Sequence, residues 1–242
     1  MRHLLSLFTI LISNCLLLNA QSDSLEIETF FQKGLELEKH RDFEGARVIY
    51  LNIVEQAKEK KLHESYAKIL NQLGLNYTAS RQLDSAIIWY ELLHEEDKLL
   101  HFTNYRLIYS SFRYLGANYS RMKKLLQSLQ VFKNCVNYVK QNISHLNGDV
   151  ELARAYNNVA VSYEVLGDTK TTLTYLDSAL KDLKENLDKP NELEAHIYGN
   201  KGNAYKKLGF FDEAADYMLM QEDVYKKLPE AVVSYNDWGW VY

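Results

Sequence analysis

Apolar residues recur at helical spacing along the chain, and short polar stretches interrupt them at regular intervals. Ile69, Leu73 and Tyr77 fall four residues apart, which places them on one face of a helix. After a polar turn, Ala86 and Tyr90 again fall four apart. The alternation predicts a helix, a short turn and a second helix, and only 2 Pro residues are present to interrupt helices in the whole chain.

This helix–turn–helix pattern recurs about every 40 residues. Each copy has a small anchor residue, an aromatic or aliphatic residue three positions later, a small residue twelve later and a large apolar residue sixteen later. Successive anchors are 40, 42, 44, 42 and 37 residues apart. The residues predicted to pack the repeats are Gly34, Leu37, Ala46, Gly74, Tyr77, Ala86, Gly116, Tyr119, Ala160, Tyr163, Gly202, Tyr205, Ala214 and Gly239.

The small anchor needs a structural reason, because glycine inside a helix costs roughly 0.5–1 kcal/mol relative to alanine. We expect the anchor to let the second helix of its pair approach closely, with the small residue twelve positions later as the opposing contact. We expect the residue three positions after the anchor to fill the space between neighbouring copies. The fourth copy departs from the pattern, with Ala160 as its anchor and Thr172 twelve later.

The pattern resembles the tetratricopeptide repeat, in an extended form whose period exceeds the usual one of about 34 residues. Residues 211–215, after Gly209, are close to the family's opening of the second helix. The resemblance covers about residues 25–242. It implies an all-α, helix-turn-helix repeat solenoid, coiled as a right-handed superhelix, with five helix pairs and the first helix of a sixth. The predicted repeats are about 25–60, 64–99, 104–141, 150–187, 192–228 and a partial one at 230–242, within an array at 21–242.

The N-terminal segment has the layout of a secretory signal peptide. A basic start at Arg2 precedes an apolar run from Leu4 to Leu18, and Ala20 comes before polar residues. We predict a signal peptide at residues 1–20. An uncleaved anchor stays open, although an apolar run of about 15 residues is short for a span of about 20, and so does a lipid anchor at Cys15. Cleavage would leave Cys135 as the last cysteine, either a small buried apolar residue or one half of an intermolecular disulfide.

Composition and motifs argue against catalysis. The net charge of −4 is not that of a dedicated nucleic-acid binder, and we expect no nucleic acid to bind this region. The HExxH, CxxC, phosphate-loop and nucleophile-elbow spacings are missing. Residues 94–97, with His101, can be drawn as a metal cluster, but they fall at a predicted helix end and linker, where solvation explains their charges. We predict no enzyme, no catalytic residue, no cofactor and no metal site.

In tetratricopeptide arrays, the first helix of each pair forms a concave wall whose polar residues hydrogen-bond an extended peptide. The resemblance therefore implies a partner-binding face on the first helices, with an ordinary polar surface as the alternative. Arg113 and Lys206 are suited to a partner's carboxylates. The candidate partner-binding residues are Asn71, Gln72, Arg113, Asn157, Asn158, Asn200, Asn203 and Lys206.

These observations predict a non-enzymatic, exported scaffold that binds a protein or a peptide. The alternative is the sensory N-terminal region of a membrane-bound signal transducer, either a histidine kinase or a transcription regulator, because long-period repeats behind a signal sequence resemble the periplasmic part of such proteins. Residues 230–242 have no second helix to cover them, so we expect a fragment of a longer protein, or an aromatic end that docks on a partner or on a second copy. We predict a periplasmic or secreted location, with an inner-membrane tether if the N-terminal segment is uncleaved or a downstream span exists.

Overall fold

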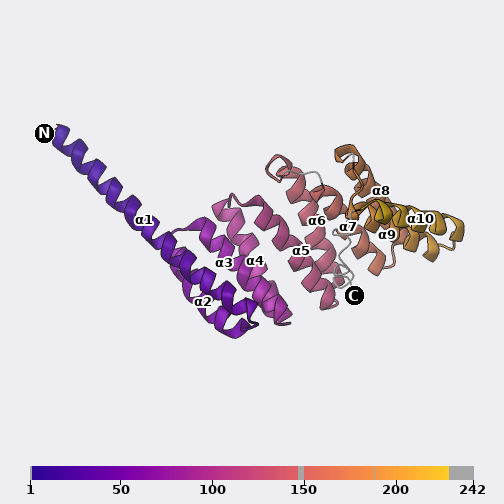
Figure 1. Ribbon diagram of the computed structural model, residues 1–242, viewed down its shortest axis with the longest axis horizontal. Coiled ribbons are helices and arrows are strands. Elements are labelled where there is room, and N and C mark those ends of the chain that lie inside the picture. The colour runs from indigo at the N-terminus through magenta and orange to yellow at the C-terminus, as the bar shows by residue number, and fades with distance from the viewer. Residues whose placement is uncertain (1, 147–149, 188, 229–242) are drawn as a thin grey trace. The chain divides into compact units, whose positions relative to one another are not determined.

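The computed structural model describes residues 2–146, 150–187 and 189–228, with side chains from residue 21 onward. These residues contain ten α-helices, one 3₁₀ turn and no strand. The helices are α1 (Arg2–Lys39), α2 (Phe43–Glu59), α3 (His63–Ala79), α4 (Leu83–Leu100), α5 (Tyr105–Arg121), α6 (Leu125–Gln141), α7 (Glu151–Val165), α8 (Thr169–Asn186), α9 (Glu192–Lys207) and α10 (Phe211–Lys227), and the 3₁₀ turn is η1 (Ile143–His145) (Figure 1).

Consecutive helices form five pairs in the described chain, beginning with α1 and α2 and ending with α9 and α10. The second helix of a pair contacts the first helix of the next, as α2 does α3, α6 does α7 and α8 does α9. This arrangement confirms the predicted all-α fold of helix–turn–helix repeats. The chain divides into two compact units, unit 1 (residues 1–108) and unit 2 (residues 109–242). The partial repeat at 230–242, with its anchor Gly239, lies outside the described residues.

The first helix, α1, runs without a break from Arg2 to Lys39 and therefore includes the predicted signal segment. The signal peptide and its cleavage stay predictions. None of the helices in the described residues combines the length and the apolar character of a membrane span.

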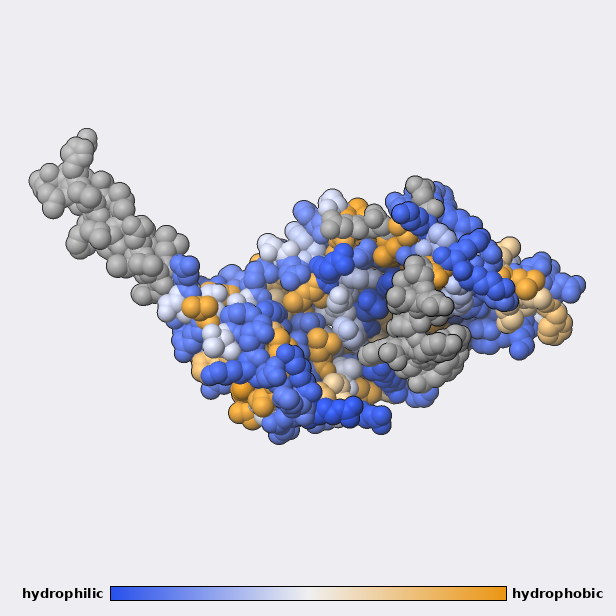
Figure 2. All heavy atoms as spheres, viewed as in Figure 1, coloured by the Kyte–Doolittle hydropathy of each residue, from blue (hydrophilic) through white to orange (hydrophobic). Residues whose placement is uncertain are grey.

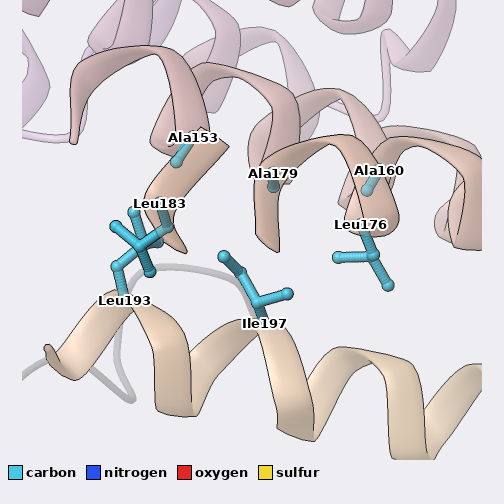
Figure 3. Packing of buried hydrophobic residues seen from close by; sticks show 7 residues of the cluster. All are labelled: Ala153, Ala160, Leu176, Ala179, Leu183, Leu193 and Ile197. Carbon is cyan, nitrogen blue, oxygen red and sulfur yellow. The ribbon is translucent and has the colours of Figure 1, made fainter. Parts of the chain in front are cut away.

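Apolar side chains from adjacent helices make the core of each unit. In unit 1, Tyr50, Leu73 and Tyr90 are fully buried. In unit 2, α9 packs on α7 and α8, and Figure 3 shows Leu193 and Ile197 pointing at the α8 side chains. Each fully buried aliphatic side chain contributes about 1.5–3 kcal/mol. The members of this unit 2 cluster are Ala153, Ala160, Leu176, Ala179, Leu183, Leu193 and Ile197.

The anchor glycines allow close approach, as predicted, but the opposing group is different in the first three pairs. A Cβ added at Gly74 would lie 2.6 Å from the Tyr90 ring, and one at Gly116 would lie 2.5 Å from the Phe132 ring. At Gly34 the nearest group is the Tyr50 ring. The large residue sixteen positions later therefore covers the glycine, where we expected the small residue twelve later. The reason is reach, because a ring extends across the helix contact and a methyl group does not.

The small residues twelve positions after the anchors are buried beside these rings. At Gly202 an added Cβ would meet the Ala214 carbonyl oxygen at 3.2 Å, so the predicted contact is present in the fifth pair. Ser128 Oγ donates to the Gly116 carbonyl at 2.8 Å. In the fourth pair, Thr172 Oγ1 donates to the carbonyl of Ala160 at 3.3 Å. The departure at Thr172 is therefore accommodated, since its hydroxyl is buried with a partner.

The residue three positions after the anchor is half-buried and packs in two ways. Tyr77 receives the Arg47 guanidinium of the preceding pair at 4.1 Å from its ring centroid. Tyr163 likewise receives the Lys133 ammonium of the preceding pair at 5.1 Å. Tyr205 stacks within its own pair, on Tyr217 at 5.3 Å, and Tyr163 also stacks within its own pair, on Tyr175 at 5.6 Å. The expected position between neighbouring copies is therefore observed for Tyr77 and Tyr163. The other members of this position, Leu37 and Tyr119, are half-buried, and the small residues Ala46 and Ala86 are fully buried.

All five turns between paired helices have the same backbone geometry. The residue seven positions after each anchor has a positive φ, between 60° and 63° at Arg41, Arg81 and Lys123 and between 83° and 85° at Gly167 and Gly209. The next amide donates back across the turn to the carbonyl of the residue three positions after the anchor, at 2.9–3.0 Å in every copy. This is the Schellman helix end, which favours glycine at the left-handed position.

A lysine stands 24 positions after each of the first five anchors, near the end of each second helix. In three copies its ammonium lies over a tyrosine ring of the following pair. The contacts are Lys58 with Tyr66 at 5.5 Å, Lys140 with Tyr156 at 5.4 Å and Lys184 with Tyr198 at 5.7 Å. A cation over an aromatic face is stabilising. A lysine–tyrosine contact of this kind therefore helps to hold the first pair to the second, the third to the fourth and the fourth to the fifth.

Candidate functional site

Two of the predicted partner-binding residues contact each other in unit 2. Asn200 on α9 donates from Nδ2 to Oδ1 of Asn157 on α7 at 2.9 Å. Asn157 is nearly buried and Asn200 is half-buried. Each amide also has a second polar group, and neither second group has a partner in the described residues. The pair therefore links adjacent first helices and keeps one donor group and one acceptor for a further ligand.

The remaining candidates of unit 2 lie on the same helices. Asn158 is half-buried, and Asn203 and Lys206 are exposed on α9. We call the candidate residues on the first helices α5, α7 and α9 the first-helix surface of unit 2. Its members are Arg113, Asn157, Asn158, Asn200, Asn203 and Lys206. In the view of Figure 2, most of the exposed side chains of the described residues are hydrophilic, and the apolar ones lie in small groups.

In unit 1, the two candidates have different surroundings. Gln72 on α3 donates from Nε2 to Oε2 of Glu38 on α1 at 2.6 Å, so its amide already joins the first two pairs. Asn71 is half-buried, and its Oδ1 is buried without a donor in the described chain. Gln72 therefore has a structural role. Asn71 is the unit 1 candidate whose side-chain oxygen has no hydrogen-bond donor in the described chain.

Arg113 is exposed on α5, and its guanidinium lies 5.9 Å from the ring centroid of Tyr109, one turn earlier. Tyr109 is buried, and burial raises the pKa of its hydroxyl well above the ordinary value. The hydroxyl therefore stays protonated at neutral pH. It has no hydrogen-bond partner in the described chain.

A residue that was not among the candidates also belongs to this region. Arg154 lies on α7, three positions before Asn157, and is half-buried. Its positive charge acts on the Tyr109 hydroxyl, together with that of Arg113. The signal that could have identified it is spacing, because residues three apart on a helix share a face.

Two acidic residues of the cluster at 94–97 and His101 interact with other protein groups. Glu96 forms an ion pair with Lys58 at 2.8 Å and accepts a hydrogen bond from Tyr66. Asp97 accepts from the Phe102 amide at 3.2 Å, at the end of α4. Across the described residues, no three His, Cys, Asp or Glu side chains converge in a geometry suited to a metal ion.

Cys135 on α6 is fully buried, in keeping with the reading of a small apolar residue. Burial raises the pKa of its thiol to about 12, so the reactive thiolate is scarce at neutral pH. A buried thiol of this kind is not placed for an intermolecular disulfide in the folded chain.

A known family model matches part of this architecture. Residues 195–219, which span most of α9 and the start of α10, match the family model of the tetratricopeptide repeat. This match covers one helix–turn–helix repeat, and the other helix pairs of the described chain have the same architecture. No curated protein sequence matches the chain significantly.

Solved structures share the fold at low sequence identity. The crystal structure of BtubC (BKLC) from P. vanneervenii is 18% identical, with 87% of this chain and 91% of that chain covered and a TM-score of 0.68. The apo form of RapI is 13% identical, with 84% and 71% covered and a TM-score of 0.71. A Rap protein complexed with Competence and Sporulation Factor is 17% identical, with 84% and 55% covered and a TM-score of 0.57. At these identities, the likeness establishes the fold alone.

Proposed function

We propose that the protein is a non-enzymatic scaffold that binds an extended protein segment or peptide on the first-helix surface of unit 2. The observation that carries the proposal is the Asn157–Asn200 bond, which aligns two amides from successive first helices. A chain of such amides suits the alternating donors and acceptors of an extended backbone. The likeness to a Rap protein complexed with Competence and Sporulation Factor supports a binding role for this fold.

The exposed side chains on the same helices extend this recognition. Asn203 adds a carboxamide one turn after Asn200, and Lys206 adds a positive charge further along α9. Asn158 follows Asn157 on α7, and Arg113 lies on the first helix α5. Polar groups of this kind give orientation and specificity, while the helical scaffold that carries them is held by its core and does not need to reorganise.

The test is a triple variant, Asn157→Ala with Asn200→Ala and Asn203→Ala. Random synthetic peptides that the wild-type chain captures should bind this variant at least about tenfold more weakly, while its melting temperature changes little. The control is Asn134→Ala with Asn137→Ala, two exposed residues of the second helix α6. Equal binding by the triple variant and the control would place the site elsewhere.

We also propose that the chain is exported to the periplasm or secreted, as its N-terminal basic and apolar regions suggest. N-terminal sequencing of protein recovered from outside the cytoplasm tests this, and a chain that keeps Met1 there contradicts cleavage. The alternative role, as the sensory region of a membrane-bound transducer, makes a different prediction. It requires an apolar span and a cytoplasmic signalling domain downstream of Tyr242 in the gene.

A further inference from the structure

Exposed apolar side chains gather at the turns that join the first helix to the second helix in the three pairs of unit 2. Six large apolar residues there are between 38% and 70% exposed, namely Leu126, Val165, Leu166, Leu208, Phe210 and Phe211. In the corresponding turns of unit 1, residues 39–44 and 79–84, which the structure describes in full, no large apolar side chain is exposed. Exposed apolar groups that occur together mark a surface that contacts something outside the chain.

The turns of the third and fourth pairs lie at the same end of the stacked helices. Lys133 of α6 lies over the Tyr163 ring of α7 at 5.1 Å. Seven residues further along α6, Lys140 lies over the ring of Tyr156, which is seven residues earlier on α7. The two helices are therefore antiparallel, and the start of α6 lies at the end of α7.

The turn of the fifth pair continues the same row. Lys207, in the last turn of α9, forms an ion pair with Glu164, in the last turn of α7, so the ends of these two first helices lie side by side. The three turns therefore form one edge. We call residues 121–126, 164–170 and 206–213 the turn edge of unit 2.

Basic residues stand among the apolar groups of the turn edge. The edge has six Lys and Arg residues and four Asp and Glu residues, a net charge of +2 in a chain whose net charge is −4. Of the acidic side chains, Asp168 is the cap of α8 and accepts from the Thr171 amide at 3.0 Å. The basic residues are Arg121, Lys123, Lys124, Lys170, Lys206 and Lys207, and the acidic ones are Glu164, Asp168, Asp212 and Glu213.

The turn between α5 and α6 keeps its positive charge at a cost in stability. Lys124 is the N-cap residue of α6, with no side-chain cap hydrogen bond and no acidic residue in the first turn after it. The other four second helices begin with a carboxylate, either in the first turn or, in α8, at the N-cap. A cation at a helix N-terminus opposes the helix dipole. Binding of an anion outside the chain explains why the third pair has cations where the other pairs have carboxylates.

We propose that the turn edge of unit 2 docks on the surface of a membrane that contains anionic lipids. Such a surface has negative headgroups above an apolar layer, which matches lysines set among exposed leucine and phenylalanine side chains. Nucleic acid would attract the cations but offers no apolar layer, and lysine is depleted at interfaces between proteins. This inference does not depend on the peptide-binding proposal.

A fluorophore that responds to its environment locates the docking edge directly. In the full chain, Cys15→Ser removes the cysteine of the N-terminal segment, and Cys135 is buried and stays unlabelled. Val165→Cys carries the fluorophore at the turn edge, and Val48→Cys carries it at a similarly exposed place on α2. On vesicles of phosphatidylcholine and phosphatidylglycerol, emission from position 165 should shift to the blue and be quenched by brominated lipid, and emission from position 48 should not. Equal responses at both positions, or none at 165, would overturn the proposal.

The lysines are tested by vesicle flotation. Lys123→Gln with Lys170→Gln should bind the same vesicles on the order of tenfold more weakly than the wild type. The difference should vanish on vesicles of phosphatidylcholine alone. Lys181→Gln with Lys226→Gln makes the same change in charge at two exposed lysines away from the turn edge and should bind as the wild type does. Equal losses in the two variants would assign binding to overall charge and contradict a docking edge.

The apolar residues separate a lipid surface from other anions. Leu126→Ser with Phe211→Ser should weaken vesicle binding on the order of tenfold, and the melting temperature should hold because both side chains are exposed. Val48→Ser with Ile88→Ser, at two similarly exposed residues of unit 1, should bind as the wild type does. If the lysine variant alone loses binding, and a DNA duplex binds as tightly as the vesicles, the edge attracts any polyanion and lipid docking is wrong.

The asparagine triple variant keeps the two proposals apart. It changes the first-helix surface and leaves the turn edge intact, so it should bind vesicles as the wild type does while losing peptides. A loss of vesicle binding in that variant would show that the membrane contacts the first-helix surface, and the turn edge would be wrong.

Discussion

Arg47 on α2 donates a hydrogen bond from Nε to Oδ1 of Asn76 on α3 at 3.1 Å. Asn76 in turn donates from Nδ2 to Oε1 of Glu38 on α1 at 2.7 Å. Arg47 is 6% exposed, and its other nitrogens donate to Glu44 and to Ser80. One buried guanidinium therefore connects three helices that belong to two repeats.

Replacing Arg47 with methionine should lower the free energy of unfolding by about 2–4 kcal/mol. The change keeps the length of the side chain but leaves the Asn76 carboxamide oxygen buried without its donor. Urea unfolding followed by circular dichroism measures the effect. Glu44→Gln is the matched control, because the Glu44 side chain is 78% exposed and its ion pair should contribute less than about 1 kcal/mol. Equal losses in the two variants would show that Arg47 acts only through Glu44.

Replacing Gly74 with alanine should destabilise the chain by about 1–3 kcal/mol, although alanine is the better helix former. The new Cβ would lie 2.6 Å from the Tyr90 ring, which is fully buried and cannot move aside freely. Gly199→Ala is the comparison, because its nearest neighbour is the flexible amide end of Gln221. That variant should be neutral or up to about 1 kcal/mol more stable. Thermal unfolding of both variants distinguishes steric crowding from helix propensity.

The left-handed turn residues predict two changes of opposite sign. Arg81 has a φ of 60°, and Arg81→Gly should raise stability by about 0.5–1 kcal/mol, because glycine adopts that conformation without strain. Gly167 has a φ of 85°, and Gly167→Ala should lower stability by about 1 kcal/mol for the same reason. Arg81→Ala removes the side chain without relieving the backbone, so a gain in that variant would disprove the explanation.

His94 predicts a loss of stability in mild acid. Burial, assisted by Lys98, lowers the pKa of His94 to about 3 in the folded chain, while the unfolded chain takes up the proton near its ordinary pKa of 6.5. The stability that depends on neutral His94 is therefore complete above pH 6.5 and falls as the pH drops toward 3. Between pH 6.5 and 5 the loss should approach about 2 kcal/mol.

Urea unfolding of the wild type, His94→Gln and His63→Gln at several pH values tests this. His94→Gln should flatten the dependence between pH 6.5 and 5. His63 is exposed, and its replacement should leave the slope as it is in the wild type. A wild-type slope in the His94 variant would assign the acid sensitivity to other groups.

The spacing of small and aromatic residues was enough to predict the helix pairs, because packing at a helix contact limits which residue sizes fit. It did not predict which residue covers each anchor glycine, since several large residues occur at neighbouring helical positions. Only the geometry of the helix contact shows that Tyr50 and Tyr90 are the residues that cover the anchor glycines of their pairs. The left-handed turn was visible where glycine occupies it, at Gly167 and Gly209. It was hidden at the other turns, where an exposed arginine or lysine adopts the same conformation.

The candidate site shows a similar division. Spacing placed Asn157 and Asn200 on first helices, because the repeat fixes the face of each helix. It did not show that the two amides bond to each other, since that depends on the offset between α7 and α9. The place of Arg154 in the sequence pattern of α7 is typical of a surface residue. Its proximity to Tyr109 depends on how α7 lies against α5, which the sequence of neither helix specifies.

The lysine near the end of each second helix has a consequence for how such a chain can change. Lys140 and Lys184 each meet a tyrosine four positions before the next anchor, so the joint after the third pair and the joint after the fourth use equivalent partners. Removing α7 and α8 would bring Lys140 to Tyr198, a partner of the same kind at the same place. Whole helix pairs can therefore be added to the array or removed from it while the lysine–tyrosine contact between successive pairs is kept.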